Sequence, residues 1–382
     1  MTATAPAQSP LAPPVATPVL DTFNAVLKKA IEVDASDVHL CAGGPFRMRV
    51  RGQIVAVNGA PTLKPADMAA IAKQILVGAR KATPDTADAA LSELKDVDCS
   101  YSLDGGGRFR VNLCSQRGSL AAVLRSIPIH TPTFEQLGLP PVMRDITMED
   151  RGLVLVTGVT GSGKSSTLAA MLGYLNGIKP NKIVTIEDPI EFLHRDQKSI
   201  MIQRELGSDT DSFATALRAA LRQDPDVIMV GEMRDRETID IALKAAETGH
   251  LVFSTVHTTD AVKTISRLVS VFDADEQRMI RLRLAESLRA VVSQRLLPRK
   301  DGKGRVVAVE IMRRTATIEE CIADPSRTTE IIDLLAEGKI EYGMQTFDQH
   351  IMELYEQDVI TLEVAKSAAT SPADLVRNLE FR

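Results

Sequence analysis

Residues 158–165 have the composition and spacing of a phosphate-binding loop. Glycines stand at the first and sixth positions and are followed by Lys164 and Ser165, which fits the pattern G-x-x-x-x-G-K-[ST]. Glycine lets backbone N–H groups approach phosphate oxygens, and the helix that follows adds the positive end of its dipole. We expect Lys164 to reach the phosphates and Ser165 to hold Mg²⁺. The residues predicted to bind the phosphates are Gly158, Thr160, Gly161, Ser162, Gly163, Lys164, Ser165 and Ser166.

Polar residues also follow three other apolar segments that we expect to be strands. Glu187 and Asp188 follow residues 182–186, Glu232 follows residues 227–230 after one glycine, and His257 follows residues 251–256. Ligands of open α/β sheets bind outside the carboxyl ends of the strands, so these segments are predicted to converge on one ligand. We predict that Glu232 is the principal residue orienting a water molecule, helped through Mg²⁺ or water by Glu187 and Asp188. Either histidine beside the third segment, His250 before it or His257 after it, is a candidate for the same site, although a hydrogen-bonded structural histidine is the alternative.

Three arginines precede the phosphate loop in a separate part of the chain. Arg108 and Arg110 alternate with apolar neighbours, so both side chains are predicted to leave the same face of a sheet, and Arg125 lies nearby in sequence. A basic sheet face can be plain solvated surface. The alternative is that these residues are arginine fingers, which neutralise transition-state charge and here would act from another domain or across a subunit boundary.

The composition is that of a globular chain with more than one domain. The chain has 382 residues, of which 44% are hydrophobic and 25% are charged, with a net charge of −5. This acidic balance argues against a general nucleic-acid binder, because no basic excess is present to neutralise phosphates. The four cysteines are scattered and predict neither a zinc site nor a disulfide framework. No apolar run approaches the length that spans a membrane, so no direct membrane insertion is expected.

The order of the predicted elements divides the chain into five segments. A Pro/Ala-rich disordered tail (1–20) is followed by a smaller α+β domain with an antiparallel sheet (21–130) and a linker (131–141). Residues 142–314 alternate apolar strands with helices, which predicts an α/β core with a parallel sheet, and residues 315–382 are predicted to form short helices. Within the core we predict a long amphipathic helix over residues 274–295 and a hairpin tip at residues 301–304.

The chain resembles the ATPases of type IV pili and type II secretion, and within them the PilT/PilU-type pilus retraction ATPases. The resemblance covers about residues 21–382 and rests on several motifs taken together. These are the phosphate loop, an aspartate box at 185–192, an acidic motif at 226–235, a histidine box at 246–258 and the arginine segment at 108–112.

The resemblance implies a PAS-like domain followed by a RecA-like ATPase core, with six copies forming a ring. It implies that ATP, with Mg²⁺, is hydrolysed at a site completed by Arg108, Arg110 and Arg125, and that Glu232 is the catalytic glutamate. ATP turnover would be coupled to retraction of a type IV pilus and hence to twitching motility. The implied partners are an inner-membrane platform protein and a second retraction ATPase, and the implied location is the cytoplasm, at the inner face of the cytoplasmic membrane.

One departure from the family pattern leaves the subtype open. Residues 317–322 carry Glu319 and Glu320 where retraction ATPases often have Arg-Asn, so the principal and the accessory retraction motor both remain candidates. Three other functions are alternatives. They are a pilus-extension or secretion ATPase, a nucleotide-binding regulator that does not hydrolyse ATP, and a DNA-translocating ring ATPase, which the acidic composition disfavours.

Overall fold

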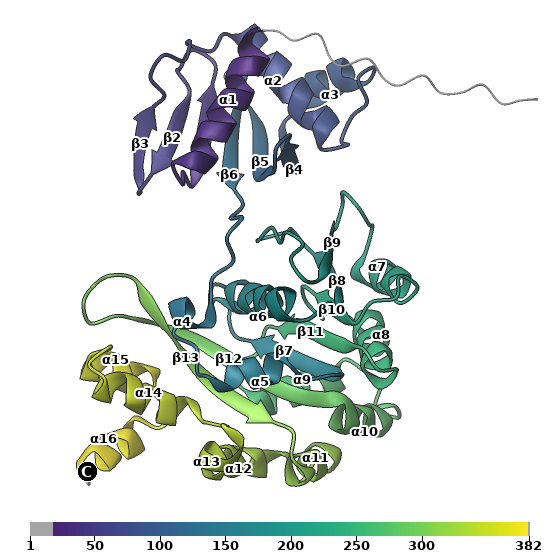
Figure 1. Cartoon of the computed structure of the whole chain (residues 1–382), viewed down its shortest axis with the longest axis vertical. Helices are drawn as coiled ribbons and strands as arrows, with labels where there is room; N and C mark the ends of the chain where they lie inside the picture. Colours follow the sequence, from purple (N-terminus) through teal and green to yellow (C-terminus); the bar gives the residue numbers. More distant parts are fainter. Residues whose placement is uncertain (1–17, 381–382) are drawn as a thin grey trace, which may run out of the picture. The chain divides into compact units, whose positions relative to one another are not determined.

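The computed structural model describes residues 18–380, which separate into two compact units after Ile127 (Figure 1). Most of the predicted tail, residues 1–17, lies outside the described residues, and the end of the tail is helical because α1 spans Pro18–Glu32. The division falls beside the predicted boundary at residue 130. The other predicted segment limits stay a prediction.

The first unit is built on a six-stranded antiparallel sheet in the order β3-β2-β1-β6-β5-β4. Helices α1 and α2 (Pro65–Gly78) pack on this sheet, and Phe23, Leu27, Ile71 and Ile75 share one core with the strands. The helix α3 (Ala87–Glu93) contacts α2. The strands are β1 (Asp37–Cys41), β2 (Arg47–Val50), β3 (Gln53–Ala56), β4 (Asp96–Leu103), β5 (Gly107–Gln116) and β6 (Ser119–Ser126).

The second unit is built on a seven-stranded sheet in the order β13-β12-β7-β11-β10-β8-β9, in which only β13 runs antiparallel to its neighbour (Figure 1). The strands are β7 (Gly152–Thr157), β8 (Lys182–Glu187), β9 (Ile200–Glu205), β10 (Val227–Val230), β11 (Leu251–Val256), β12 (Leu288–Pro298) and β13 (Arg305–Arg313). The predicted fold class, an α/β parallel-sheet domain preceded by a smaller α+β domain, is confirmed.

Helices cover both faces of this sheet. Alternate residues of each strand point to opposite sides, and here the residues on both sides are apolar and have to be buried. Leu153 and Leu155 of β7 join the core beneath the helices α7 to α11. Val154 and Val156 join the core on the other face, with α5 and α6. The bounds are α5 (Val142–Thr147), α6 (Lys164–Ile178), α7 (Phe213–Ala220), α8 (Arg236–Glu247), α9 (Ala261–Ser270), α10 (Gln277–Ser287) and α11 (Ala316–Ala323).

Three sequence-based expectations differ from the structure. The long helix predicted over 274–295 is wrong in its second half, because α10 ends at Ser287 and β12 follows directly. That half is largely buried, polar Ser293 and Gln294 included, and pairs with β7 and β13, so hydrogen bonding to two strands decides its conformation. The edge strand β9 was not predicted. The predicted linker 131–141 contains helix α4 (Phe134–Leu137), and its Phe134 ring lies 5.4 Å from that of Tyr174 on α6.

The C-terminal segment consists of short helices, as predicted. Helix α11 packs on α10, while α14 packs on β13. The remaining elements are α12 (Ile331–Glu337), α13 (Lys339–Tyr342), α14 (Phe347–Glu356), α15 (Leu362–Ala368), α16 (Pro372–Glu380) and a 3₁₀ turn at Thr328–Glu330. Within residues 18–380, no helix is both long and apolar enough to cross a bilayer.

Candidate nucleotide-binding site

The phosphate loop connects the buried strand β7 to the first turn of α6, as the sequence predicts. Its backbone requires glycine at position 158, because a Cβ there would come within 2.4 Å of the Ser162 hydroxyl and 2.7 Å of the Gln294 carbonyl, and φ is +147°. The Lys164 ammonium folds back over the loop and donates to the carbonyl oxygens of Gly158 (2.9 Å) and Val159 (3.1 Å). Burial lowers the pKa of Lys164. The loop is therefore a preformed cradle with its cation already in place.

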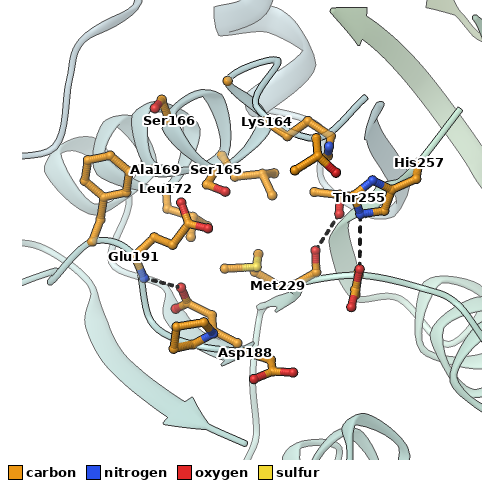
Figure 2. Close-up of a pocket in the computed structure, with 18 of the residues that line it drawn as sticks. Lys164, Ser165, Ser166, Ala169, Leu172, Asp188, Glu191, Met229, Thr255 and His257 are labelled. Atoms are coloured by element: carbon orange, nitrogen blue, oxygen red, sulfur yellow. Dashed lines mark hydrogen bonds and ion pairs between the residues drawn. The ribbon is translucent and has the colours of Figure 1, made fainter. Parts of the chain in front are cut away.

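A cavity of about 610 Å³ opens beside this loop at the carboxyl ends of the parallel strands (Figure 2). It brings together most of the predicted site residues, which come from segments far apart in the sequence. Those that line it are Thr160, Gly161, Gly163, Lys164, Ser165, Ser166, Glu187, Asp188, Glu232 and His257. Gly158 and Ser162 belong to the loop behind this wall, where the buried Ser162 hydroxyl has no hydrogen-bond partner among the described residues.

Glu232 is held at the cavity wall by two basic side chains. One carboxylate oxygen lies 2.7 Å from Arg234 Nε, and the other lies 3.2 Å from His257 Nε2. The Glu232 side chain is 15% exposed, so it still reaches the cavity. The segment that carries it is fixed from the next strand, because the Thr255 hydroxyl donates to the Gly231 carbonyl at 2.6 Å. A carboxylate with a fixed orientation that faces a phosphate cradle is suited to positioning a water molecule.

Glu187 lies at the end of the neighbouring strand β8 in a different environment. Its carboxylate accepts hydrogen bonds from the Thr185 hydroxyl (2.6 Å), the Gln203 amide (3.2 Å) and the Glu191 backbone N–H (3.4 Å). Burial raises the pKa of Glu187, although these three donors oppose the shift. The side chain therefore holds the strand ends and the following loop together at the edge of the cavity.

Four predicted residues do not belong to the wall of this cavity within the second unit. His250 precedes β11 and so lies at the opposite, amino end of the sheet, where its Nδ1 is 3.0 Å from the Ala245 carbonyl oxygen. Arg108, Arg110 and Arg125 belong to the first unit. Phe109 between the first two is fully buried while Arg110 is exposed, so the predicted alternation is confirmed. Arg125 Nε pairs with Asp37 at 3.0 Å.

Several residues of the cavity were not predicted as part of the site. Arg234 lies within the acidic motif, two positions after Glu232, and that spacing was an available signal. His194 follows the aspartate box and is partly buried, which lowers its pKa to about 4, so it is neutral at neutral pH. Gln203 does not line the cavity but donates to Glu187 at its edge, and it was missed because its strand, β9, was missed. The other unpredicted lining residues include Glu191, Phe192, Phe213, Met229, Thr255 and Leu296.

The donor set fits Mg²⁺ held mainly by phosphate oxygens. Ser165 and Asp188 supply hard oxygen atoms to the cavity, which are the ligands that Mg²⁺ prefers. Among residues 18–380, no cluster of three or more His, Cys, Asp and Glu side chains could hold a metal by itself. Mg²⁺ normally keeps only one or two protein ligands beside substrate phosphates, so the arrangement agrees with a nucleotide-borne ion.

The fold and the cavity define a nucleotide-binding ATPase of the phosphate-loop class. A sequence profile described as "Type II/IV secretion system protein" matches residues 15–371, and the chain belongs to this family. The chain is 46% identical to PilT, a type IV pilus retraction ATPase of Pseudomonas aeruginosa, over 88% of this chain and 95% of that relative. It is 40% identical to the type IV pilus ATPase PilU of the same organism, over 92% of this chain and 90% of the relative.

A solved structure supports the same assignment. The crystal structure of the pilus retraction motor PilT with bound ADP has a TM-score of 0.78 and 43% identity, and the match covers 93% of this chain and 99% of that one. The family predicted from the motifs, and with it the prediction of an ATPase, is confirmed.

Proposed function

We propose that the chain is an ATP-hydrolysing motor that drives retraction of a type IV pilus. One observation carries this proposal. The phosphate loop and the Glu232–His257 pair, from three separate strand ends, face the same 610 Å³ cavity. The similarity to PilT and PilU, which are named as pilus ATPases, supports the pilus system as the place where this motor acts.

In this proposal each wall of the cavity has its own task. The phosphate loop and Lys164 bind the β- and γ-phosphates, and Ser165, with Asp188 nearby, holds the Mg²⁺ that neutralises them. Glu232 orients the attacking water and accepts its proton. Arg234 and His257 hold the two Glu232 oxygens, so the carboxylate does not have to reorganise during the reaction. Glu187 fixes the adjoining strand ends from behind.

Arginines of the first unit complete the site in the proposed ring of six copies. Arg110 and Arg125 are cross-strand neighbours on β5 and β6, so their guanidinium groups leave the sheet side by side. Arg125 is partly neutralised by Asp37, which leaves Arg110 as the stronger candidate for contact with a nucleotide. Mixing Arg110→Ala subunits with Lys164→Ala subunits should restore part of the ATP turnover if the arginine acts on the site of another copy. No recovery would assign Arg110 to the architecture of its own unit.

The remaining partners belong to the same proposal. A ring at the cytoplasmic face of the inner membrane would push on a platform protein there, and a second retraction ATPase would share this partner. His250 keeps no role in nucleotide binding within one chain, because it lies at the other end of β11.

Two measurements test the proposal. The purified full chain should hydrolyse ATP with Mg²⁺, and Lys164→Ala should abolish binding and turnover. A chain that binds ATP without turnover would instead support the non-hydrolysing regulator.

A strain that lacks the gene should carry many surface pili, counted by electron microscopy, and should show no twitching motility. Bald cells would assign the chain to pilus extension. A piliated, motile strain would contradict a principal retraction role and favour an accessory motor.

A further inference from the structure

We propose that Glu310 is a positioning residue for ATP hydrolysis, because its carboxylate holds the loop that presents His257 to Glu232. The inference rests on the proposed function and concerns a residue outside the nucleotide cavity. Glu310 lies on β13, on the far side of β12 and β7 from the strand that carries His257. Its side chain is 8% exposed, so a functional explanation must come from its buried contacts.

The contact that matters is at the start of α9. Glu310 Oε1 accepts a hydrogen bond of 2.9 Å from the backbone N–H of Ala261, the first residue of this helix. The first N–H groups of a helix have no partner within the helix, and a negative charge there is stabilised by the helix dipole. A carboxylate from a distant strand therefore fixes the point at which the His257 loop becomes helical.

The loop between His257 and Ala261 is held by two further side-chain contacts. The Asp260 side chain accepts from the Lys263 N–H at 2.8 Å, and the Thr258 hydroxyl lies 2.7 Å from that of Thr264. Both contacts tie the loop to α9 alone. The hydrogen bond to Glu310 joins the start of α9 to the sheet, while Ile265 and Leu268 pack the rest of the helix into the core. Losing this bond would therefore release the loop and the first turn of α9.

A row of buried polar residues also extends across the sheet from Glu310 to the strand before the phosphate loop. Glu310 is the register partner of Ser293 on β12, and Ser293 is the register partner of Thr157 on β7. The Thr157 hydroxyl donates to that of Ser293 at 3.0 Å, and both side chains are fully buried. Thr157 directly precedes Gly158, so the row of Glu310, Ser293 and Thr157 lies next to both the phosphate loop and the His257 loop.

The surroundings of Glu310 bring the pKa of its carboxyl group close to neutral pH. Burial is the main reason that its pKa is raised to about 7; the nearby carboxylates of Asp260 and Asp348 act in the same direction, while the Ala261 N–H and Arg295 oppose the shift. Asp260 comes from the α9 loop, Arg295 from β12 and Asp348 from α14, which are the elements packed around β13. The ionised form is the stronger acceptor for the helix N–H, so it positions the loop better.

The test compares three variants of the full chain. Glu310→Leu removes the acceptor, Glu310→Gln keeps an acceptor oxygen without charge, and His350→Gln is the matched control. His350 is also buried beside β13 and accepts the Val309 N–H at 2.9 Å, but no hydrogen bond joins it to α9. ATPase rates and ATP KM are measured together with amide hydrogen exchange of residues 257–265.

We expect Glu310→Leu to lower kcat about tenfold with KM changed less than about twofold, because only the water-positioning pair is disturbed. Exchange at 257–265 should rise in this variant and not in His350→Gln. The ratio of Glu310→Gln to wild-type kcat should fall from about pH 6 to about pH 8, because wild type gains its charge there. This ratio decides the question even if Glu310→Leu does not fold.

An unchanged kcat in Glu310→Leu, an equal loss in His350→Gln, or a ratio that is flat with pH would overturn the inference. If wild type hydrolyses no ATP, the proposed function fails. The positioning role is then judged by hydrogen exchange alone, and equal exchange in wild type and Glu310→Leu would overturn it.

Discussion

The ends of the adjacent strands β8 and β10 carry two glutamates that look alike in sequence and differ in their surroundings. Glu232, after β10, is paired with two basic side chains and faces the cavity. Glu187, at the end of β8, accepts only from neutral donors and is nine-tenths buried, so its pKa is raised. The comparison teaches that a strand-end position alone does not define a catalytic carboxylate. The partners of the carboxylate decide whether it acts on the ligand or on the fold.

The largest effect is expected for Glu232→Gln. The amide cannot accept a proton, so kcat should fall about 10²-fold or more while ATP binding is retained. ATP binding and turnover are measured separately on the full chain. Glu191→Gln is the matched control, because it removes the same charge from the same cavity without touching His257. An equal loss in the control would show that net charge, rather than the position of Glu232, matters.

A smaller and different effect is expected for Glu187→Gln. The Gln side chain brings an NH₂ group to a place where only donors converge, so one buried donor loses its partner at a cost of about 1–3 kcal/mol. The variant should unfold at a lower temperature and lose less kcat than Glu232→Gln. A kcat loss as large as that of Glu232→Gln, at unchanged thermal stability, would make Glu187 the catalytic residue and reverse the comparison.

The difference in stability between wild type and Glu187→Gln should depend on pH. The folded-state pKa of Glu187 is raised above its ordinary value. At pH values between the two, folded wild type therefore binds a proton that the unfolded chain does not. Its stability relative to Glu187→Gln should therefore be greatest below the ordinary carboxyl pKa and decline as pH rises to the folded pKa. Thermal unfolding midpoints of both proteins across this range measure the difference. A difference that grew with pH would contradict the raised pKa.

The smallest effect is expected for Arg234→Ala. The Arg234 side chain is 72% exposed, so its ion pair with Glu232 should contribute no more than about 1 kcal/mol to stability. Turnover should fall a few-fold, since His257 still holds the other oxygen. Arg236→Ala, a neighbouring exposed arginine paired with Asp273 and Glu276, controls for lost surface charge. A loss in Arg234→Ala as severe as in Glu232→Gln would indicate that Arg234 itself contacts the phosphates.

The sequence by itself determined the phosphate loop and the strands that end in polar groups. Glycine spacing and apolar runs act over a few residues, so the backbone between Leu153 and Ser165 could be predicted without knowing the rest of the fold. The alternation at 108–111 was equally local. Local periodicity predicted a helix at residues 288–295, but these residues hydrogen-bond to β7 and β13 and so form part of a strand.

Only the tertiary structure decided which polar groups meet. Strand β11 lies between β7 and β10, and this order places His257 beside Glu232 across 25 positions of sequence. It leaves His250 at the other end of the same strand. The contact of Glu310 with Ala261 spans 49 positions of sequence and joins β13 to the helix that follows β11, although β12 and β7 lie between these two strands in the sheet. Such pairings depend on strand order and register, which long-range packing sets, so no local pattern could have revealed them.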